Sequence, residues 1–194
     1  MGEKSQKKRK YILETARKVF LEKGYKDVTM KDIVEACDIS RGGLYLYFSS
    51  TKEIFLEVLK MEAADTDDVF GSNISKDATA ADILALFLKE QKKELLRKNN
   101  NLTLATYEFF FAEDMPKKDN LLKNQFDSAV KIIEKLIEAG VESGEFYCDD
   151  CSGAARNIMF VLEGLKVTSQ TIGITQETVD RELLYIMRGL AADE

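Results

Sequence analysis

The chain has 194 residues, of which 45% are hydrophobic and 32% are charged, a balance typical of a soluble globular protein. Its 11 glycines and single proline argue against a β-sandwich with many turns and favour long helices. The net charge of −6 is unevenly distributed: residues 1–60 carry 13 basic and 9 acidic side chains, and the remaining residues carry 15 and 25. Because phosphate contacts need only a locally basic face, the acidic remainder does not exclude a nucleic-acid partner.

Cysteine usage and hydropathy predict a soluble, cytoplasmic protein. Three cysteines are an odd number in a chain of this size, which does not indicate a disulfide framework and fits a reducing compartment. Charged residues continue through Arg17 and Lys18, so the basic N-terminus is not followed by the apolar stretch of a signal peptide. The apolar run around Phe109 is interrupted by Glu108 and Glu113 and is too short to span a membrane.

The first predicted helix covers residues 7–23, and a second, short helix follows it. Apolar side chains in the first helix recur with the spacing of one helical face, at Ile12, Ala16, Val19 and Phe20. Gly24 is a stop signal. Thr29 can cap the free amides of the second helix, which directs three side chains inward: Ile33, Val34 and Cys37. Asp38 then suits a tight turn, because aspartate tolerates the left-handed backbone better than most residues.

Ser40 is a second capping candidate and opens a third predicted helix that extends to about Phe48. The sequence Ser50-Thr51-Lys52-Glu53 has the spacing of a capping box, which predicts a fourth helix from that point. Residues 71–78 are polar and predict a loop. Further helices are expected over residues 79–97, 102–114, 119–142, 152–171 and 176–191. Since no segment shows sustained strand alternation, the predicted fold class is all-α.

The second and third helices and the turn between them have the pattern of a helix-turn-helix. In this motif the second helix presents its N-terminal side chains to base edges in the major groove and packs its other face inward. Leu44 and Phe48, four residues apart, can form the inner face. The outer face is then left with Arg41, Gly42, Gly43 and Tyr45. The two glycines each cost about 1 kcal/mol of helix propensity relative to alanine, and close approach of the backbone to DNA is a possible compensation.

The stretch from Gly24 to Phe48 resembles the DNA-binding domain of TetR-family transcriptional regulators. The match extends over about 25 residues at the family's spacing and rests on Gly24-Tyr25, Thr29, Ile33, Ser40, Gly42, Leu44-Tyr45 and Tyr47-Phe48. The chain departs from the family pattern at several places. Val34 and Cys37 replace alanines, Asp38 replaces the turn glycine, Leu46 stands where histidine is frequent, and the loop before Lys52 is one residue longer.

The resemblance implies a set of DNA-binding residues: Thr29, Lys31, Ser40, Arg41, Gly42, Gly43, Tyr45, Tyr47 and Lys52. Thr29, Lys31 and Lys52 would contact phosphate, Arg41 and the two glycines would lie against base edges, and the two tyrosines would hold the DNA backbone. Two alternatives remain open from the residues themselves: the tyrosines could be partly core, and Arg41 could be merely solvated. The run Lys7-Lys8-Arg9-Lys10 is either a DNA-contacting arm or a solvated helix start.

The resemblance further implies an N-terminal three-helix DNA-binding domain in residues 1–51 and a larger helical domain for effector binding and dimerisation in residues 52–194. The partner DNA would be a double-stranded, near-palindromic operator, bound by a homodimer that acts as a repressor. The helices at 152–171 and 176–191 would pair with their copies in the dimer. Closing the core of a monomer is the alternative for these two helices.

The helix predicted at 102–114 has apolar residues on all sides, which predicts full burial. Its aromatic residues could line a cavity for a small effector, with the candidate contacts Tyr107, Glu108, Phe110 and Phe111. Such an effector would be apolar or aromatic, and could be cationic if Glu108 and Glu113 face the cavity. Plain core packing is the alternative.

The remaining motifs do not indicate catalysis, and neither a cofactor nor a metal ion is expected. Cys148 and Cys151 form a CxxC, but the chain has no histidine and no second CxxC. Two interpretations therefore remain: a zinc or redox role, or two cysteines without a function. The absence of histidine also removes the commonest general base, and no nucleophile elbow or P-loop is present. An enzyme and a carrier or interaction bundle without DNA activity are the rival classes.

Overall fold

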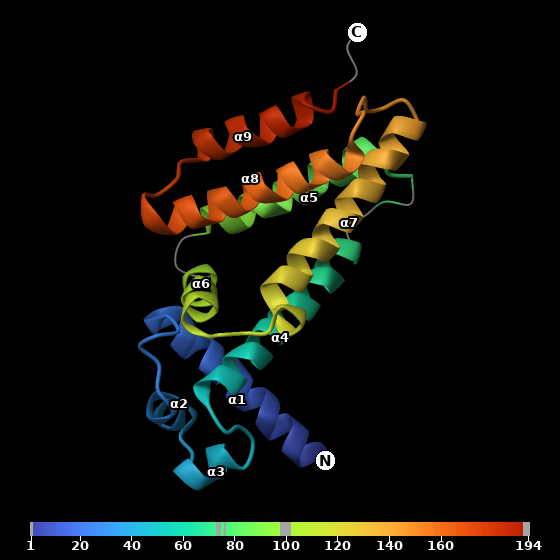
Figure 1. The fold of residues 1–194 in the computed structure, drawn as a ribbon. Helices are drawn as coiled ribbons and strands as arrows, with labels where there is room; N and C mark the ends of the chain where they lie inside the picture. The colour runs from blue at the N-terminus through green and yellow to red at the C-terminus, as the bar shows by residue number, and fades with distance from the viewer. Residues whose placement is uncertain (1, 73–74, 76, 98–101, 192–194) are drawn as a thin grey trace. The chain divides into compact units, whose positions relative to one another are not determined.

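A computed structural model describes residues 2–72, 75, 77–97 and 102–191, and in these residues the regular secondary structure is helical apart from an isolated bridge between Phe146 and Ala191 (Figure 1). The α-helices are α1 Glu3–Lys23, α2 Met30–Cys37, α3 Arg41–Tyr45, α4 Thr51–Ser72, α5 Ala80–Leu96, α6 Thr103–Ala112, α7 Leu121–Glu142, α8 Cys151–Thr171 and α9 Gln176–Arg188. A short 3-10 helix, η1, spans Lys117–Asp119. The predicted all-α fold is confirmed.

The chain divides into two compact units. The first unit comprises Met1–Ser72 and Lys98–Asp114, and the second comprises Asn73–Arg97 and Met115–Glu194. Helices α4 and α6 therefore belong to the same unit as α1, α2 and α3, and the predicted DNA-binding residues 1–51 lie wholly within it. Of the loop predicted at 71–78, residues 71 and 72 continue α4, whereas residues 73, 74 and 76 lie outside the described residues.

Aromatic side chains from helices far apart in the sequence meet in the core of the first unit. The rings of Phe20 and Phe55 lie 4.7 Å apart, and those of Tyr25 and Phe109 lie 4.9 Å apart. Phe109 comes from α6, and its ring also lies 5.2 Å from that of Phe55, so the buried face of α6 packs on α4 and on Tyr25, just after the end of α1. Aromatic pairs at these distances add stability beyond the area they bury.

The prediction that α6 is fully buried is wrong. Ala105 and Phe109 are buried, but Leu104 is exposed and the side chain of Phe111 is 84% exposed. A helix that is apolar on every side has no periodic signal to distinguish one covered face from full enclosure. In the structure the buried face of α6 is the one that carries Phe109, which contacts Phe55 of α4 and Tyr25.

The second unit is a bundle in which α5 packs against α7, α8 and α9, and α7 runs beside α8. Its core is formed by buried aliphatic residues with the helical spacing seen in the sequence, including Leu84, Ile137, Leu162 and Val179. Side-chain caps at Thr79, Asn120, Asp150 and Thr175 fix the four helix starts. The predicted helices of this unit agree with the observed ones to within three residues at each end, because capping and periodicity are local signals. In the first unit, α1 begins at Glu3, four residues before the predicted start at residue 7.

Candidate nucleic-acid interface

Two caps and one left-handed residue set the geometry of the helix-turn-helix. At the start of α2, the Oγ1 of Thr29 accepts the backbone N–H of Asp32 at 3.3 Å, and the Asp32 carboxylate accepts the N–H of Thr29 at 2.8 Å. Asp38 ends α2 with φ 50° and ψ 50°, the left-handed conformation expected for it. At the start of α3, the Oγ of Ser40 accepts the N–H of Gly43 at 3.0 Å. The predicted capping roles of Thr29 and Ser40 are confirmed.

The helix α3 is held in place by its inner face. Leu44 and Phe48 are completely buried, as predicted, although the helix ends at Tyr45 and residues 46–47 form a turn. The guanidinium of Arg9, on α1, lies 5.0 Å above the ring of Phe48 and donates to Glu57 on α4 at 2.5 Å. Arg9 therefore links Phe48, on the inner side of the motif, to Glu57 of α4. This position argues against Arg9 as part of a free basic arm.

The outer face of α3 carries the residues expected to face DNA. Arg41 and Gly42 are exposed, Tyr45 is 44% exposed, and Tyr47 is half-buried. The Arg41 guanidinium lies 5.6 Å from the centre of the Tyr45 ring, one helical turn away, which is within the range of a cation–π contact. The structure thus leaves the predicted base-reading residue exposed to solvent, whereas Leu44 is buried.

The three predicted phosphate contacts differ in their surroundings. Lys31 is exposed and has only a loose ion pair, at 3.6 Å, with Glu35. The hydroxyl of Thr29 donates to Asp32, so it is already used in the cap of α2. The ammonium of Lys52 lies 2.9 Å from the Glu113 carboxylate of α6. A phosphate would have to compete with Glu113 for Lys52, which makes Lys31 the most accessible of the three.

Two hydrogen-bond donors stabilise the charge on Glu113. The hydroxyl of Tyr25 donates to it at 2.6 Å, and this bond together with the pairing to Lys52 lowers the pKa of Glu113 below its usual value. Burial, with the same hydrogen bond, raises the pKa of the Tyr25 hydroxyl well above its ordinary value. Tyr25 therefore stays neutral and keeps donating its proton to α6.

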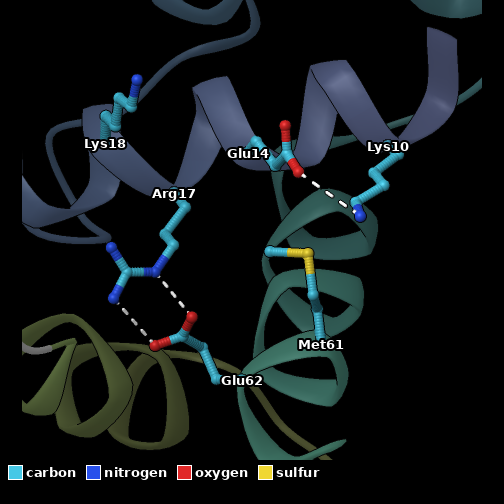
Figure 2. Close-up of a pocket in the computed structure, with 6 residues that line it drawn as sticks. All are labelled: Lys10, Glu14, Arg17, Lys18, Met61 and Glu62. Atoms are coloured by element: carbon cyan, nitrogen blue, oxygen red, sulfur yellow. Dashed lines mark hydrogen bonds and ion pairs between the residues drawn. The ribbon is translucent and has the colours of Figure 1, made fainter. Parts of the chain in front are cut away.

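A groove with a volume of about 500 Å³ lies between α1 and α4 (Figure 2). Its lining residues are Lys10, Glu14, Arg17, Lys18, Met61 and Glu62. Figure 2 shows the Arg17 guanidinium fork facing the Glu62 carboxylate, with N–O distances of 2.6 and 3.0 Å. The charged side chains that line it are largely paired with each other. None of the predicted effector contacts lines it, and of the predicted basic run it includes Lys10.

Comparisons with known proteins agree with this geometry. Residues 12–58 match the model of the bacterial regulatory proteins of the tetR family, and residues 83–180 match that of the tetracyclin repressor-like C-terminal domain. The chain is 31% identical over 145 residues to the HTH-type transcriptional regulator YfiR of Bacillus subtilis, covering 74% of this chain and 70% of that protein. The chain belongs to the TetR family. It is accordingly a helix-turn-helix transcriptional regulator, and the family's proteins are not enzymes.

Two further relatives of this TetR-family regulator span most of its length. The HTH-type transcriptional regulator QacR of Staphylococcus aureus is 24% identical over 156 residues, covering 79% of this chain and 81% of its own. A solved structure of a transcriptional regulator from Saccharomonospora viridis in complex with choline superposes with a TM-score of 0.84 at 22% identity, covering 97% of this chain and all of that one. This second likeness shows that the regulator shares the fold.

The four predicted effector contacts of the regulator lie on α6, within the first unit. The Glu108 carboxylate accepts the backbone N–H groups of Tyr25 at 2.6 Å and Lys26 at 3.2 Å, just after the end of α1. Tyr107 and Phe110 are half-buried, and the Tyr107 ring stacks 6.4 Å from the exposed ring of Phe111. Sequence reasoning could not find the bond of Glu108 to Tyr25, because 83 residues separate the partners.

The cysteines of the regulator are free thiols, and Cys148 and Cys151 are half-buried at the start of α8. Burial, together with the neighbouring Cys148, raises the pKa of the Cys151 thiol, which disfavours the reactive thiolate. Within the residues that the structure describes, no three cysteine or carboxylate side chains gather as a metal site would require. In the part of the chain that the structure describes, no helix is long and apolar enough to cross a membrane.

Proposed function

We propose that this regulator is a repressor that binds a near-palindromic operator as a homodimer and is released from it by a small-molecule effector. The observation that carries the proposal is the two-sided character of α3 and the turn after it. Leu44 and Phe48 are buried, whereas Arg41, Gly42 and Tyr45 face solvent. A rigid inner face and an arginine at the helix start are what major-groove reading requires, since arginine donates two hydrogen bonds to guanine O6 and N7.

The test of DNA reading starts from selection of bound fragments from a random DNA pool, which gives the half-site and its spacing together. Arg41→Ala should then weaken binding by about 1–3 kcal/mol and relax the preference at one position per half-site. Lys89→Ala is the matched control, because it removes an exposed positive charge from α5, in the second unit. Unchanged affinity and unchanged preference in Arg41→Ala would show that α3 does not read bases through this residue.

Dimerisation through α8 and α9 is supported by apolar side chains that these helices leave exposed. Phe160 and Val167 lie on one stripe of α8 with Gly164 between them, and Leu184 and Tyr185 are exposed on α9. A contiguous exposed apolar surface on a soluble chain is typical of an interface. A dimer also doubles the DNA contacts, which a single small module needs for specificity.

Phe160→Glu should convert the dimer to monomer in analytical ultracentrifugation, because it places a charge inside the proposed interface. Ile132→Glu is the control, since Ile132 on α7 is also exposed and apolar but lies outside the two helices. If Phe160→Glu sediments as wild type does, the interface is elsewhere.

Effector release is supported by the position of α6 in the first unit. Tyr107, Glu108, Phe110 and Phe111 are the proposed contacts, and Glu108 is bonded directly to the backbone that follows α1. A ligand that draws Glu108 away would break bonds inside the DNA-binding unit, so binding and release would be coupled. The complex of the Saccharomonospora viridis regulator with choline supports including cationic compounds among the candidates.

A thermal-shift screen of apolar, aromatic and quaternary ammonium compounds, choline included, tests this part of the proposal. A true effector should raise the melting temperature of the wild-type protein and weaken its binding to the selected operator. Phe110→Ala should reduce the shift, whereas Ile132→Ala, on α7 and outside the proposed interface, should not. A complete screen without any stabilising compound would contradict an apolar or cationic effector.

A further inference from the structure

Gly42 and Leu46 form an uncovered strip along the solvent side of the reading motif. They lie four residues apart, one on α3 and the other at its C-terminal cap, so both belong to the same helical face. Leu46 is 82% exposed, in contrast to Leu44 and Phe48, which take all of the inward packing. Leu46 contributes nothing to the core of the first unit, and its hydrocarbon surface is open to a partner.

The fold of the first unit does not require a glycine at position 42. Its φ is not positive, since among the described residues positive values occur at Asp38, Gly24, Gly144 and Gly173. A Cβ built on Gly42 would meet no heavy atom within 4 Å, whereas one on Gly43 would lie 3.1 Å from the Ser40 Oγ that caps α3. The close approach of the Ser40 hydroxyl in the cap therefore accounts for a glycine at position 43. Gly42 weakens the helix without any internal benefit, which indicates that its missing side chain serves a partner outside the chain.

The apolar group that a major groove offers along its base edges is the C5-methyl of thymine. The strip continues the exposed face that carries Arg41 and Tyr45, so a helix lying in the groove brings Leu46 to the same base edges. We infer that Leu46 packs on a thymine methyl in each half-site, and that the bare backbone at Gly42 allows α3 to approach closely enough for this contact. The inference rests on the proposed DNA reading by α3 and adds one specified base to it.

The experiment replaces each thymine of the selected operator with deoxyuridine, which removes only the C5-methyl, and measures binding of wild type and Leu46→Ala. One deoxyuridine position per half-site should weaken wild-type binding about four-fold per substituted half-site, as expected for one buried methyl-sized group. Leu46→Ala should bind the thymine operator less tightly and be insensitive to that substitution. Ile132→Ala, which also truncates an exposed apolar side chain but on α7, should behave as wild type does.

Gly42→Ala provides the second readout. It should raise the melting temperature, because alanine favours the helix and meets no neighbour, and yet weaken operator binding at least ten-fold. The inference is overturned if no deoxyuridine position affects wild type, if Leu46→Ala keeps the full methyl sensitivity, or if Gly42→Ala binds normally. In these cases wild type still selects an operator, so the proposed function survives. Wild type without any sequence-selective binding would overturn both.

Discussion

Replacing Gly24 with alanine should destabilise the first unit by about 2.5–6 kcal/mol, the sum of a backbone term and a hydrogen-bond term. Gly24 ends α1 with φ 76° and ψ −173°, a region open essentially to glycine, and placing another residue there costs about 1–3 kcal/mol. A Cβ at this position would also lie 2.5 Å from Oε2 of Glu108. The carboxylate must move away and lose its bonds to the N–H groups of Tyr25 and Lys26, which adds about 1.5–3 kcal/mol.

Three further variants separate these two contributions. Gly144→Ala has a similar φ of 78° with no atom within 4 Å of the new Cβ, so it reports backbone strain without a clash. Glu108→Ala removes the carboxylate bonds without strain. In Gly24→Ala/Glu108→Ala the bonds are lost only once, so the double variant should be about 1.5–3 kcal/mol more stable than additivity predicts.

The assay is equilibrium urea unfolding followed by circular dichroism. All variants are compared at one fixed protein concentration, because the stability of the proposed dimer would depend on concentration. The reasoning is refuted if Gly24→Ala changes the unfolding free energy by less than about 0.5 kcal/mol, which is the scale of an ordinary surface substitution. If the unfolding free energies of Gly24→Ala and Glu108→Ala add strictly in the double variant, the backbone-strain term stands. The proposed displacement of the Glu108 carboxylate by the new Cβ is then refuted.

Three other outcomes are expected. Phe48→Ala should cost about 3–5 kcal/mol in the same urea assay, because it empties a buried site beneath Arg9; a loss under 1 kcal/mol would contradict the burial. The folded pKa of Glu113 lies below its unfolded value of 4.5, so the ionised carboxylate stabilises the fold above that pH, and this stability is lost as the pH falls through the folded pKa. The stability advantage of wild type over Glu113→Gln should therefore shrink below about pH 4.5. A difference that stays constant with pH would contradict this role of Glu113. Tyr47→Phe should weaken binding to all DNA sequences alike in a fluorescence anisotropy titration, and a change of base preference would assign Tyr47 to base reading.

The local features of the helix-turn-helix could be predicted because each depends on residues close together in the chain. Thr29 and Ser40 cap backbone amides three residues ahead, and Asp38 needs only its own backbone conformation. The capping box at the start of α4 shows how far such reasoning extends. Ser50 accepts the N–H of Glu53 at 3.2 Å as expected, but the Glu53 carboxylate turns to the N–H and hydroxyl of Ser49 instead.

Long-range contacts within the first unit came only from the tertiary structure. Arg9 pairs with Glu57 across 48 residues, and Glu108 reaches Tyr25 across 83, and no periodicity or motif connects positions so far apart. The same holds for α6, whose evenly apolar sequence does not specify which face is covered. For Lys52, the partner Glu113 could not be inferred from a capping pattern that ends at Glu53.

The sequence by itself determined the all-α class, the starts of the helices that a side chain caps and the position of the reading helix after Ser40. Capping, turn chemistry and helical periodicity are short-range properties of the chain. The tertiary structure decided which charged residues remain available to a partner. Lys31 and Arg41 face solvent, whereas Arg9 and Lys52 are paired with glutamates of other helices. This difference depends on how the helices pack, because the glutamates that pair with Arg9 and Lys52 are distant in sequence and are brought close only by folding.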